Sequence, residues 1–464
     1  MAKLKSVYIC QNCAAASPKW SGRCPECGAW NSLIEQPATE PARGGHVLAK
    51  SRGRPLTSQP LSSITPAARS RRLPTGFGEI DQLLGGGLVP GSVVLLAGQP
   101  GIGKSTLVLQ LAAHVAATGQ TALYVSGEES VEQIHLRAFR LGLGSSGLQL
   151  AASTSADDIA ATIAGTENAL VVVDSVQTLS LDQLSSAPGT ISQITNAANL
   201  LIRAAKRAGS CVVMIGHVTK EGGIAGPKIL EHAVDVVLQL EGDRYGGLKV
   251  VRASKNRYGS TNEAALLEMT DSGLLPADNP SAILLAERLG SDGSIVMATI
   301  EGNRPLLVEI QALVTPTHFG YPKRTASGFD LNRLNVLIAV IERRSRLKLS
   351  DKDVFVNVVG GLRLQDPAAD LAVCMAVASA AAGRKLADAT VVFGEVGLSG
   401  EIRSVPKPDL RIEEAARLGF KQAVTPPTQT GRPSSGKSGK AKVALQPVRE
   451  LRQAFNQFLE SAGK

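Results

Sequence analysis

Residues 98–106, with the sequence Gly-Gln-Pro-Gly-Ile-Gly-Lys-Ser-Thr, constrain the fold of this 464-residue chain more than any other segment. They match the phosphate-binding loop pattern, in which glycines let backbone N–H groups turn towards phosphates, a lysine reaches the β- and γ-phosphates, and a hydroxyl binds Mg²⁺. We expect Lys104 and Ser105 to take the last two roles. The alternative, a glycine-rich connector, is disfavoured because residues 92–97 predict a buried strand before the loop, and residues 106–113 predict a helix whose positive N-terminus faces it. The residues expected to contact a nucleotide here are Gly98, Gln99, Pro100, Gly101, Ile102, Gly103, Lys104, Ser105 and Thr106.

A length of 464 residues predicts two to four domains, and a hydrophobic fraction of 44% places the chain among ordinary globular proteins. No stretch of 18 apolar residues is present, and the first five residues, Met-Ala-Lys-Leu-Lys, do not begin an apolar signal core, so we expect a soluble, cytoplasmic protein without membrane contact. A net charge of +9 favours a polyanionic partner. Only 3% of residues are aromatic, so we expect no base-stacking platform of the OB-fold or RRM kind, and any DNA contact to be mainly electrostatic.

Four of the six cysteines form two knuckles, Cys10-x2-Cys13 and Cys24-x2-Cys27, within residues 1–36. This spacing predicts a zinc ribbon with four thiolate ligands, and the segment is too short to build a core without the metal. Disulfides are the alternative, and a reducing compartment disfavours them. Cys211 and Cys374 lie in apolar runs and are predicted to be small core residues.

Two segments lack hydrophobic periodicity. Residues 37–72 are predicted to be a flexible linker, which either tracks a phosphate backbone or serves only as a soluble tether. Residues 428–442, rich in Gly, Ser, Pro and Lys, are predicted to be a disordered surface insertion. The basic residues of the linker are Arg43, Lys50, Arg52, Arg54, Arg69, Arg71 and Arg72.

Acidic residues follow two further predicted strands. Residues 122–126 lead to Glu128 and Glu129, either of which is a candidate catalytic base. Residues 169–174 end in Asp174, the Walker B arrangement for holding Mg²⁺ through its water shell.

A third buried strand, residues 211–217, ends at His217. This histidine either senses the γ-phosphate or is a hydrogen-bonded residue at a strand end. The loop after it carries Lys220 and Lys228, which are suited to gripping phosphates, including those of DNA. Strands that alternate with helices, and polar residues at the strands' carboxyl ends, predict a doubly wound α/β domain over residues 73–280.

Several motifs occur in the order seen in bacterial RadA, also called Sms, a family of RecA-like ATPases of DNA repair and recombination. The chain resembles this family over nearly its whole length, although the family usually has Phe at the position of Tyr258. The resemblance implies a hexameric ring, ATP, Mg²⁺ and Zn²⁺ as cofactors, single-stranded or branched DNA as ligand, and a RecA-type recombinase as partner of the ribbon. The motifs are the zinc knuckles, residues 98–106, Tyr-Val-Ser-Gly-Glu-Glu-Ser (124–130), Ile-Gly-His-Val-Thr-Lys-Glu-Gly (215–222) and Lys-Asn-Arg-Tyr-Gly (255–259).

The resemblance also assigns roles. It implies that Lys255 and Arg257 reach the γ-phosphate of a neighbouring subunit's nucleotide, as cationic fingers do in RecA-like rings. Without it, residues 254–259 could be a turn with two solvated charges. It places Glu128, rather than Glu129, as the base that polarises the attacking water.

Residues 281–464 resemble the Lon protease domain, an α+β fold. Lon needs a serine nucleophile, and this chain has Ala368 at that position, so we expect a proteolytically inactive scaffold. Either Arg411 or Lys407 lies near the position of the catalytic lysine of Lon. A basic cluster elsewhere in residues 281–464 is a candidate DNA contact or, equally, a solvated helix end. It consists of Arg343, Arg344, Arg346 and Lys348.

Three functional hypotheses follow. The first is an ATP-driven motor on DNA that promotes branch migration in recombinational repair. The second is an ATP-dependent peptidase, against which Ala368 argues. The third is a KaiC-like signalling ATPase, a class that normally has tandem nucleotide domains, whereas this sequence has one P-loop.

Overall fold

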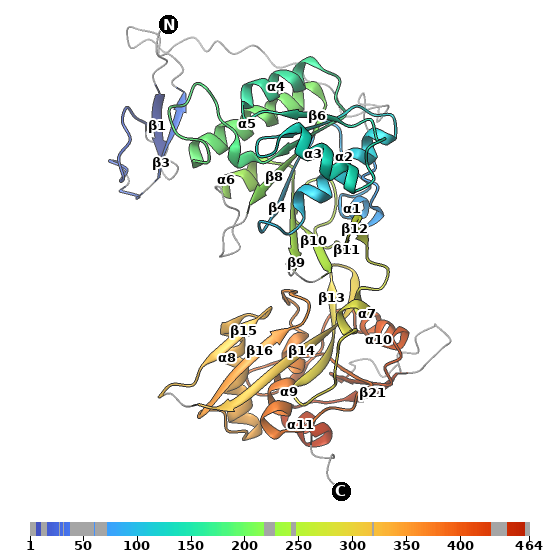
Figure 1. Ribbon diagram of the computed structural model, residues 1–464. Coiled ribbons are helices and arrows are strands. Elements are labelled where there is room, and N and C mark those ends of the chain that lie inside the picture. Colours follow the sequence, from blue (N-terminus) through green and yellow to red (C-terminus); the bar gives the residue numbers. More distant parts are fainter. Residues whose placement is uncertain are drawn as a thin grey trace. The chain divides into compact units, whose positions relative to one another are not determined.

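The structure is a computed structural model that describes residues 6–10, 16–26, 28–30, 32–37, 60, 72–217, 228–242, 247–317, 320–427 and 443–459 (Figure 1). Two compact units divide the chain. One contains Met1–Leu240, Ala253–Thr261 and Asp271–Leu274, and the other contains Glu241–Arg252, Asn262–Thr270 and Leu275–Lys464. Segments of the two units alternate along the chain between residues 241 and 275, whereas the sequence predicts a single boundary between residues 280 and 281. In the described part of the chain no helix is long and apolar enough to cross a membrane.

The ribbon is a three-stranded antiparallel sheet of order β2-β1-β3, with strands β1 (Ser6–Cys10), β2 (Ala16–Ser17) and β3 (Leu33–Pro37). Its core consists of Cys10, Cys24 and Leu33, with Tyr8 packed against them. A core of this size cannot offset the conformational entropy of folding, as expected for a segment that depends on a metal.

A nine-stranded sheet has the order β12-β11-β10-β9-β4-β8-β7-β5-β6, and its strands β4 to β8 lie within the first unit. Its strands from β9 to β6 are parallel. Apolar residues occupy every position of β7 except its last, because a parallel sheet is covered on both faces. The strands are β4 (Val93–Gly98), β5 (Ala122–Ser126), β6 (Gln149–Ala152), β7 (Leu170–Asp174), β8 (Cys211–His217), β9 (Val236–Gly242), β10 (Leu248–Asn256), β11 (Ala264–Thr270) and β12 (Gly273–Pro276).

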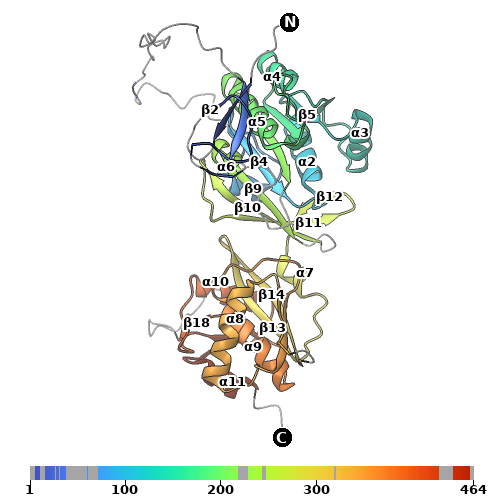
Figure 2. The same cartoon turned by 90° about the vertical axis from the view of Figure 1, so that its left-hand side faces the viewer.

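Helices cover both faces of this sheet (Figure 2). α4 and α5 share a core with alternate residues of β4, β5, β7 and β8, while α2 packs on the opposite face. Local signals fix the helix ends: Ser130 caps α3 in a capping box, Ser155 caps α4, and Gly209 in the left-handed region ends α5. The helices are α1 (Gly78–Leu83), α2 (Lys104–Ala117), α3 (Val131–Arg140), α4 (Ala156–Gly165), the short η2 (Val176–Thr178), α5 (Ile191–Ala208) and α6 (Lys228–Ala233).

The second unit is an α+β domain with a mixed seven-stranded sheet of order β15-β16-β14-β13-β17-β20-β21. Its central helix α9 (Ala369–Ala382) is apolar nearly all round because every residue before its last three is buried. The strands are β13 (Ser294–Glu301), β14 (Arg304–Pro316), β15 (Arg324–Ser327), β16 (Lys352–Val358), β17 (Thr390–Val392), β20 (Gln422–Thr425) and β21 (Ala444–Pro447), with a separate pair β18 (Glu395–Val396) and β19 (Ile402–Arg403). The other helices are α7 (Pro280–Leu285), α8 (Leu331–Val340), the π-helix η3 (Ile341–Ser345), α10 (Pro408–Arg417) and α11 (Leu451–Leu459).

Candidate nucleotide site

The phosphate-binding loop joins the end of the central strand β4 to the start of α2, as its sequence predicts. Gly101 and Gly103 adopt φ values of +77° and +111°, which L side chains rarely allow. A Cβ atom at Gly98 would lie 2.7 Å from the carbonyl oxygen of Leu240 on the neighbouring strand β9. These glycines are therefore required by the path of the backbone, quite apart from any ligand.

Lys104 begins α2, and its residue is only 4% exposed. Its ammonium group donates to the carbonyl oxygens of Gly98 (2.9 Å) and Gln99 (3.0 Å). Burial lowers the pKa of Lys104, and the negative charges of Asp174 and Glu128 oppose that shift. Two predicted acids from separate parts of the chain thus lie close enough to Lys104 for their charges to act on it.

Asp174 ends β7, and one of its carboxylate oxygens accepts a hydrogen bond of 2.5 Å from the Tyr124 hydroxyl group. Burial, reinforced by the charge of Asp174, raises the pKa of Tyr124 well above its ordinary value. Ser105 is the second residue of α2. A hydroxyl and a carboxylate are hard oxygen donors, so the residues fit a Mg²⁺ ion.

The side chains of Glu128 and Glu129 have different partners, although Ser126 Oγ accepts the backbone N–H groups of both residues. Glu128 accepts a hydrogen bond of 2.6 Å from Ser175, the residue after Asp174. Glu129 pairs instead with Arg137 of α3, at 2.8 Å. Of the two carboxylates, Glu128 is the one whose negative charge acts on the pKa of Lys104.

Sequence reasoning missed the polar residues that hold these acids. Arg137 also donates to the Tyr124 hydroxyl group over 3.3 Å, which completes a chain of contacts from Glu129 to Asp174. A tyrosine at the middle of a mostly apolar strand was the available signal, because its hydroxyl group needs a partner when buried.

The structure places the other predicted nucleotide contacts as follows. His217 ends β8 with its backbone paired to that of Gly98, beside the start of the loop. Ile102 is buried, whereas Gln99, Pro100 and Gly101 are exposed, and Thr106 is the third residue of α2. Lys228 begins α6, and Lys220 lies outside the described residues.

Lys255 and Arg257 lie at the other end of the sheet. Lys255 donates to the carbonyl oxygens of Glu231, His232 and Val234, around the carboxyl end of α6, where a cation is favoured. Arg257 donates to the Asp235 carboxylate at 3.1 Å, and its side chain remains 52% exposed. The two cations are therefore bound to the protein and are not the solvated charges of a simple turn.

The turn that carries these cations is anchored to the region of α1. Asn256 donates to the carbonyl of Leu83, and Arg72 donates to the carbonyls of Leu84 (2.8 Å) and Tyr258 (3.1 Å). The assignment of Arg72 to the flexible linker is therefore wrong, because its guanidinium group belongs to the folded domain. The other basic linker residues lie outside the described residues.

The ribbon's described cysteines, Cys10 and Cys24, are both buried. Around the second knuckle, Cys24 N–H donates to the Ala29 carbonyl, and Gly28 N–H donates back to the Cys24 carbonyl. Two buried thiols at the knuckles fit the donor set of a structural zinc ion. Cys13 and Cys27 lie outside the described residues.

Ala368 in the second unit is fully buried. Its backbone N–H donates to Asp366, whose carboxylate forms a buried ion pair of 2.6 Å with Arg411. Arg411 also donates to the carbonyl of Ala298. Lys407 is exposed and bonds to Gly302 and Asn303, so Arg411 is the cation beside Ala368.

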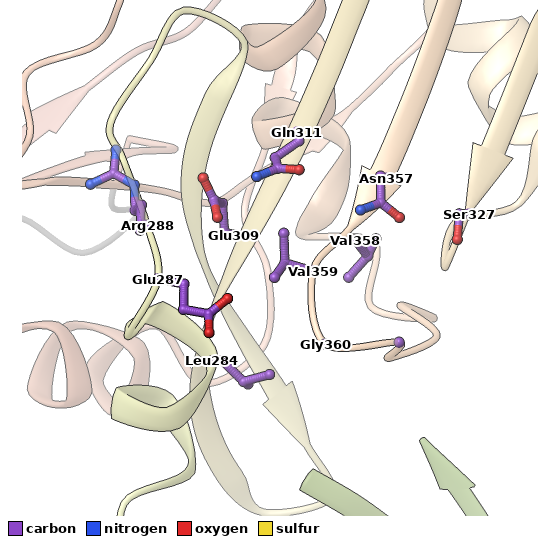
Figure 3. Close-up of a pocket in the computed structure, with 11 residues that line it drawn as sticks. Leu284, Glu287, Arg288, Glu309, Gln311, Ser327, Asn357, Val358, Val359 and Gly360 are labelled. Atoms are coloured by element: carbon purple, nitrogen blue, oxygen red, sulfur yellow. The ribbon is translucent and has the colours of Figure 1, made fainter. Parts of the chain in front are cut away.

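The predicted basic cluster lies around η3, where Arg343 and Arg346 are exposed and Arg344 reaches the Leu398 carbonyl at 3.4 Å. A pocket of about 270 Å³ in the same unit includes none of the predicted site residues (Figure 3). Gln311 and Asn357, paired across β14 and β16, line it together with Glu309, whose carboxylate accepts a hydrogen bond from Ser294.

The doubly wound sheet, the loop after its central strand and the acids at neighbouring strand ends define a RecA-like P-loop ATPase. Family models agree: the AAA domain matches residues 65–223, the rubredoxin metal binding domain residues 8–35, and subunit ChlI of Mg-chelatase residues 332–429. These matches support ATP, Mg²⁺ and Zn²⁺ as the cofactors expected from the sequence.

Known relatives narrow the class. The chain is 46% identical to the DNA repair protein RadA of Bacillus subtilis over 434 residues, 92% of this chain and 93% of the relative. It is 45% identical to the DNA repair protein RadA of Pseudomonas aeruginosa over 461 residues, 99% and 100% of the two chains. Among solved structures, a RadB recombinase is 24% identical with a TM-score of 0.36, covering 44% of this chain and 100% of that one. The chain belongs to the RadA family of DNA repair proteins, which confirms the resemblance found in its motifs.

Proposed function

We propose that this chain is a DNA-dependent ATPase of recombinational repair, which drives branch migration as a ring-shaped, hexameric motor on single-stranded DNA. One observation supports assembly into a ring: Lys255 and Arg257 lie at the end of the sheet opposite their own phosphate-binding loop. Asp235, which holds Arg257, also accepts the N–H of Val93 at the start of β4, and the loop begins at Gly98 at its end. Five strand residues at about 3.3 Å each separate the two ends by about 16 Å.

The chemistry within one subunit follows from the side chains at the carboxyl end of the sheet. Lys104 offsets negative charge that develops on the transferred phosphoryl group. Its ammonium N–H groups now donate to the carbonyl oxygens of Gly98 and Gln99, and the same N–H groups turn to the phosphates. A Mg²⁺ ion held by Ser105 and Asp174 supplies further charge neutralisation when bound. Glu128, aligned by Ser175, orients and polarises the attacking water.

The catalytic cation comes from a neighbour. Arg257 is half exposed and therefore can extend from Asp235 towards another subunit's γ-phosphate. The resemblance implies the same role for Lys255, but three carbonyl groups hold its ammonium group, so we propose that Lys255 orients the turn instead. A contact between the finger end of one subunit and the loop end of the next is heterologous, and such contacts generate a ring when the rotation between neighbours closes. The proposed site is thus shared between two subunits.

The proposed DNA contacts rest on charge. The net charge of +9, the exposed Arg343 and Arg346 and the positions of Lys220 and Lys228 after β8 favour a phosphate backbone as ligand. The relatives are DNA repair proteins, which supports single-stranded or branched DNA and a RecA-type recombinase as partners.

The test couples hydrolysis to strand movement. ATP hydrolysis is measured with and without single-stranded DNA, and extension of a paired strand is followed at recombination intermediates made by a RecA-type filament. The proposal expects DNA to stimulate hydrolysis and ATP to be required for extension, with Lys104→Ala as the inactive control. Hydrolysis that ignores DNA, together with no ATP-dependent extension, would refute the motor.

A further inference from the structure

The zinc ribbon contains both tryptophans of the entire chain, and both are exposed. Trp20 is 58% and Trp30 72% exposed. Large aromatic side chains normally contribute to cores or to interfaces, because their burial is strongly favourable. Two such residues on one small ribbon, whose own core uses neither, indicate a binding surface.

The two rings converge on the same place. A Cβ atom built on Gly22 would lie 3.9 Å from Cζ3 of Trp30 and 4.0 Å from Cη2 of Trp20. One atom of each ring therefore lies within van der Waals reach of the place where a side chain at residue 22 would begin. Because residue 22 is glycine, no side chain occupies that place.

A fixed cation accompanies the rings. The guanidinium group of Arg23 lies 5.8 Å from the centroid of the Trp30 ring, in a cation–π contact, and Arg23 Nε donates to the Gly28 carbonyl over 2.9 Å. Arg23 and Trp30 are paired in an antiparallel bridge on either side of the Cys24 knuckle. Lys19 is exposed next to Trp20. The knuckle thus sets the positions of one ring and one cation.

We propose that Trp20, Trp30 and Arg23 form a stacking site for the bases of single-stranded DNA, with Lys19 and Arg23 facing its phosphates. Stacking on aromatic rings beside cations is how proteins hold single strands without reading sequence. Among the described ribbon residues the other charges are Glu26, which is exposed, and Glu35, which is buried and accepts a hydrogen bond from Ser185. The ring surface is therefore more cationic than acidic, which favours a nucleic acid over an acidic protein partner.

The site revises an expectation from composition. The low aromatic content argued against base stacking, but a fraction over the whole chain does not show where the aromatic residues lie. The inference rests on the proposed function only in its choice of single-stranded DNA as ligand, since the motor could operate with every DNA contact elsewhere.

The two tryptophans make the test direct, because intrinsic tryptophan fluorescence of the full chain comes from the ribbon alone. The zinc-loaded protein is titrated with a dT homopolymer, and binding is followed in parallel by the anisotropy of a labelled dT strand. Saturable quenching of tryptophan emission at the same concentrations is expected, since stacked bases contact the rings. A strand of the same length whose sugars carry no bases should bind more weakly and quench little.

Substitutions of Trp30 distinguish a loss of stacking from a loss of the folded ribbon. Trp30→Ala should weaken dT binding by about fivefold to a hundredfold, and Trp30→Phe by clearly less, because Phe keeps a stacking face. Leu289→Ala, which removes another exposed apolar side chain, is the matched control and should leave binding unchanged. Zinc content per chain checks that each variant's ribbon is folded.

Three results would overturn the site. They are dT binding by anisotropy without a change in tryptophan emission, Trp30→Ala variants that hold zinc and bind dT as the parent does, and emission that changes on adding a RecA-type recombinase but not on adding dT. In the last case the rings contact protein. If DNA still stimulates hydrolysis in any of these cases, the proposed motor function is unaffected. The stacking site and the motor function can therefore be refuted independently.

Discussion

Arg257 and Asp235 form an ion pair of 3.1 Å at the amino end of the sheet's parallel strands, with Asp235 almost fully buried. The second carboxylate oxygen of Asp235 accepts the N–H of Val93, the first residue of β4. This pair therefore fixes the cation at one end of the strand that carries the phosphate-binding loop at its other end.

The first prediction is complementation between two inactive variants. Arg257→Ala should retain ATP binding and lose hydrolysis by about a thousandfold or more, the usual contribution of an arginine finger. Lys104→Ala should lose hydrolysis as well. When the two are co-assembled, about a quarter of the sites should combine an intact loop with an intact neighbouring finger, and hydrolysis should return in that proportion.

The control for this experiment is the double variant Lys104→Ala/Arg257→Ala, co-assembled with Lys104→Ala. It supplies no intact loop, so no hydrolysis should appear. If Arg257→Ala alone hydrolysed ATP normally, or if the complementing mixture stayed inactive in verified mixed rings, the finger would not act in trans.

The second prediction separates the two adjacent glutamates. Glu128→Gln should lower the rate of hydrolysis by about a hundredfold to ten-thousandfold while ATP still binds, because Glu128 lies with Ser175 and Asp174. Glu129→Gln removes a partly exposed ion pair with Arg137 and should cost far less. Single-turnover experiments measure the rate of hydrolysis, and equilibrium binding of a fluorescent ATP analogue measures ATP binding. Equal losses in both variants would contradict the assignment.

Local pattern predicted the strand ends, the loop and the acids at the correct edge of the sheet, because each depends on residues near one another in sequence. The difference between Glu128 and Glu129 did not follow from pattern, since Arg137 and Ser175 select between them through tertiary contacts. Arg72 was misplaced for a related reason. A run of basic residues indicates a linker, and only the carbonyl groups of Leu84 and Tyr258 show that its last member is part of the fold.

The third prediction concerns acid stability of the second unit. Burial raises the pKa of Glu414, but hydrogen bonds from Arg417 and Ser281 outweigh burial and hold the pKa below its usual 4.5. A carboxylate whose pKa is lowered by folding stabilises the fold above its unfolded-state pKa, and this contribution is lost as the pH falls through the lower, folded value.

Glu414→Gln should therefore lower the melting temperature at neutral pH and reduce the further loss of stability below about pH 4.5. Thermal unfolding from pH 3 to pH 7, followed by circular dichroism, makes the comparison. Glu26→Gln, an exposed acid of the ribbon, serves as the control and should leave both quantities nearly unchanged. Identical pH profiles for Glu414→Gln and the parent chain would show that the two hydrogen bonds do not stabilise the ionised form.

The last prediction concerns the place where a Lon protease would hold its nucleophile. Arg411 and Asp366 form a buried ion pair beside Ala368, and Asp366 also accepts hydrogen bonds from Thr299 and from the backbone of Ile300. Removing one partner of a buried pair leaves an uncompensated charge, so Arg411→Ala should destabilise the second unit by about 3–5 kcal/mol. Lys407→Ala, at the exposed neighbouring cation, should cost less than about 1 kcal/mol. Denaturant unfolding of the full chain measures both. The ion pair gives Asp366 and Arg411 a structural role, so restoring a hydroxyl group alone should not restore proteolysis. Ala368→Ser should therefore hydrolyse no casein. Peptidase activity in that variant would show that the site keeps more of the protease machinery than its buried ion pair indicates.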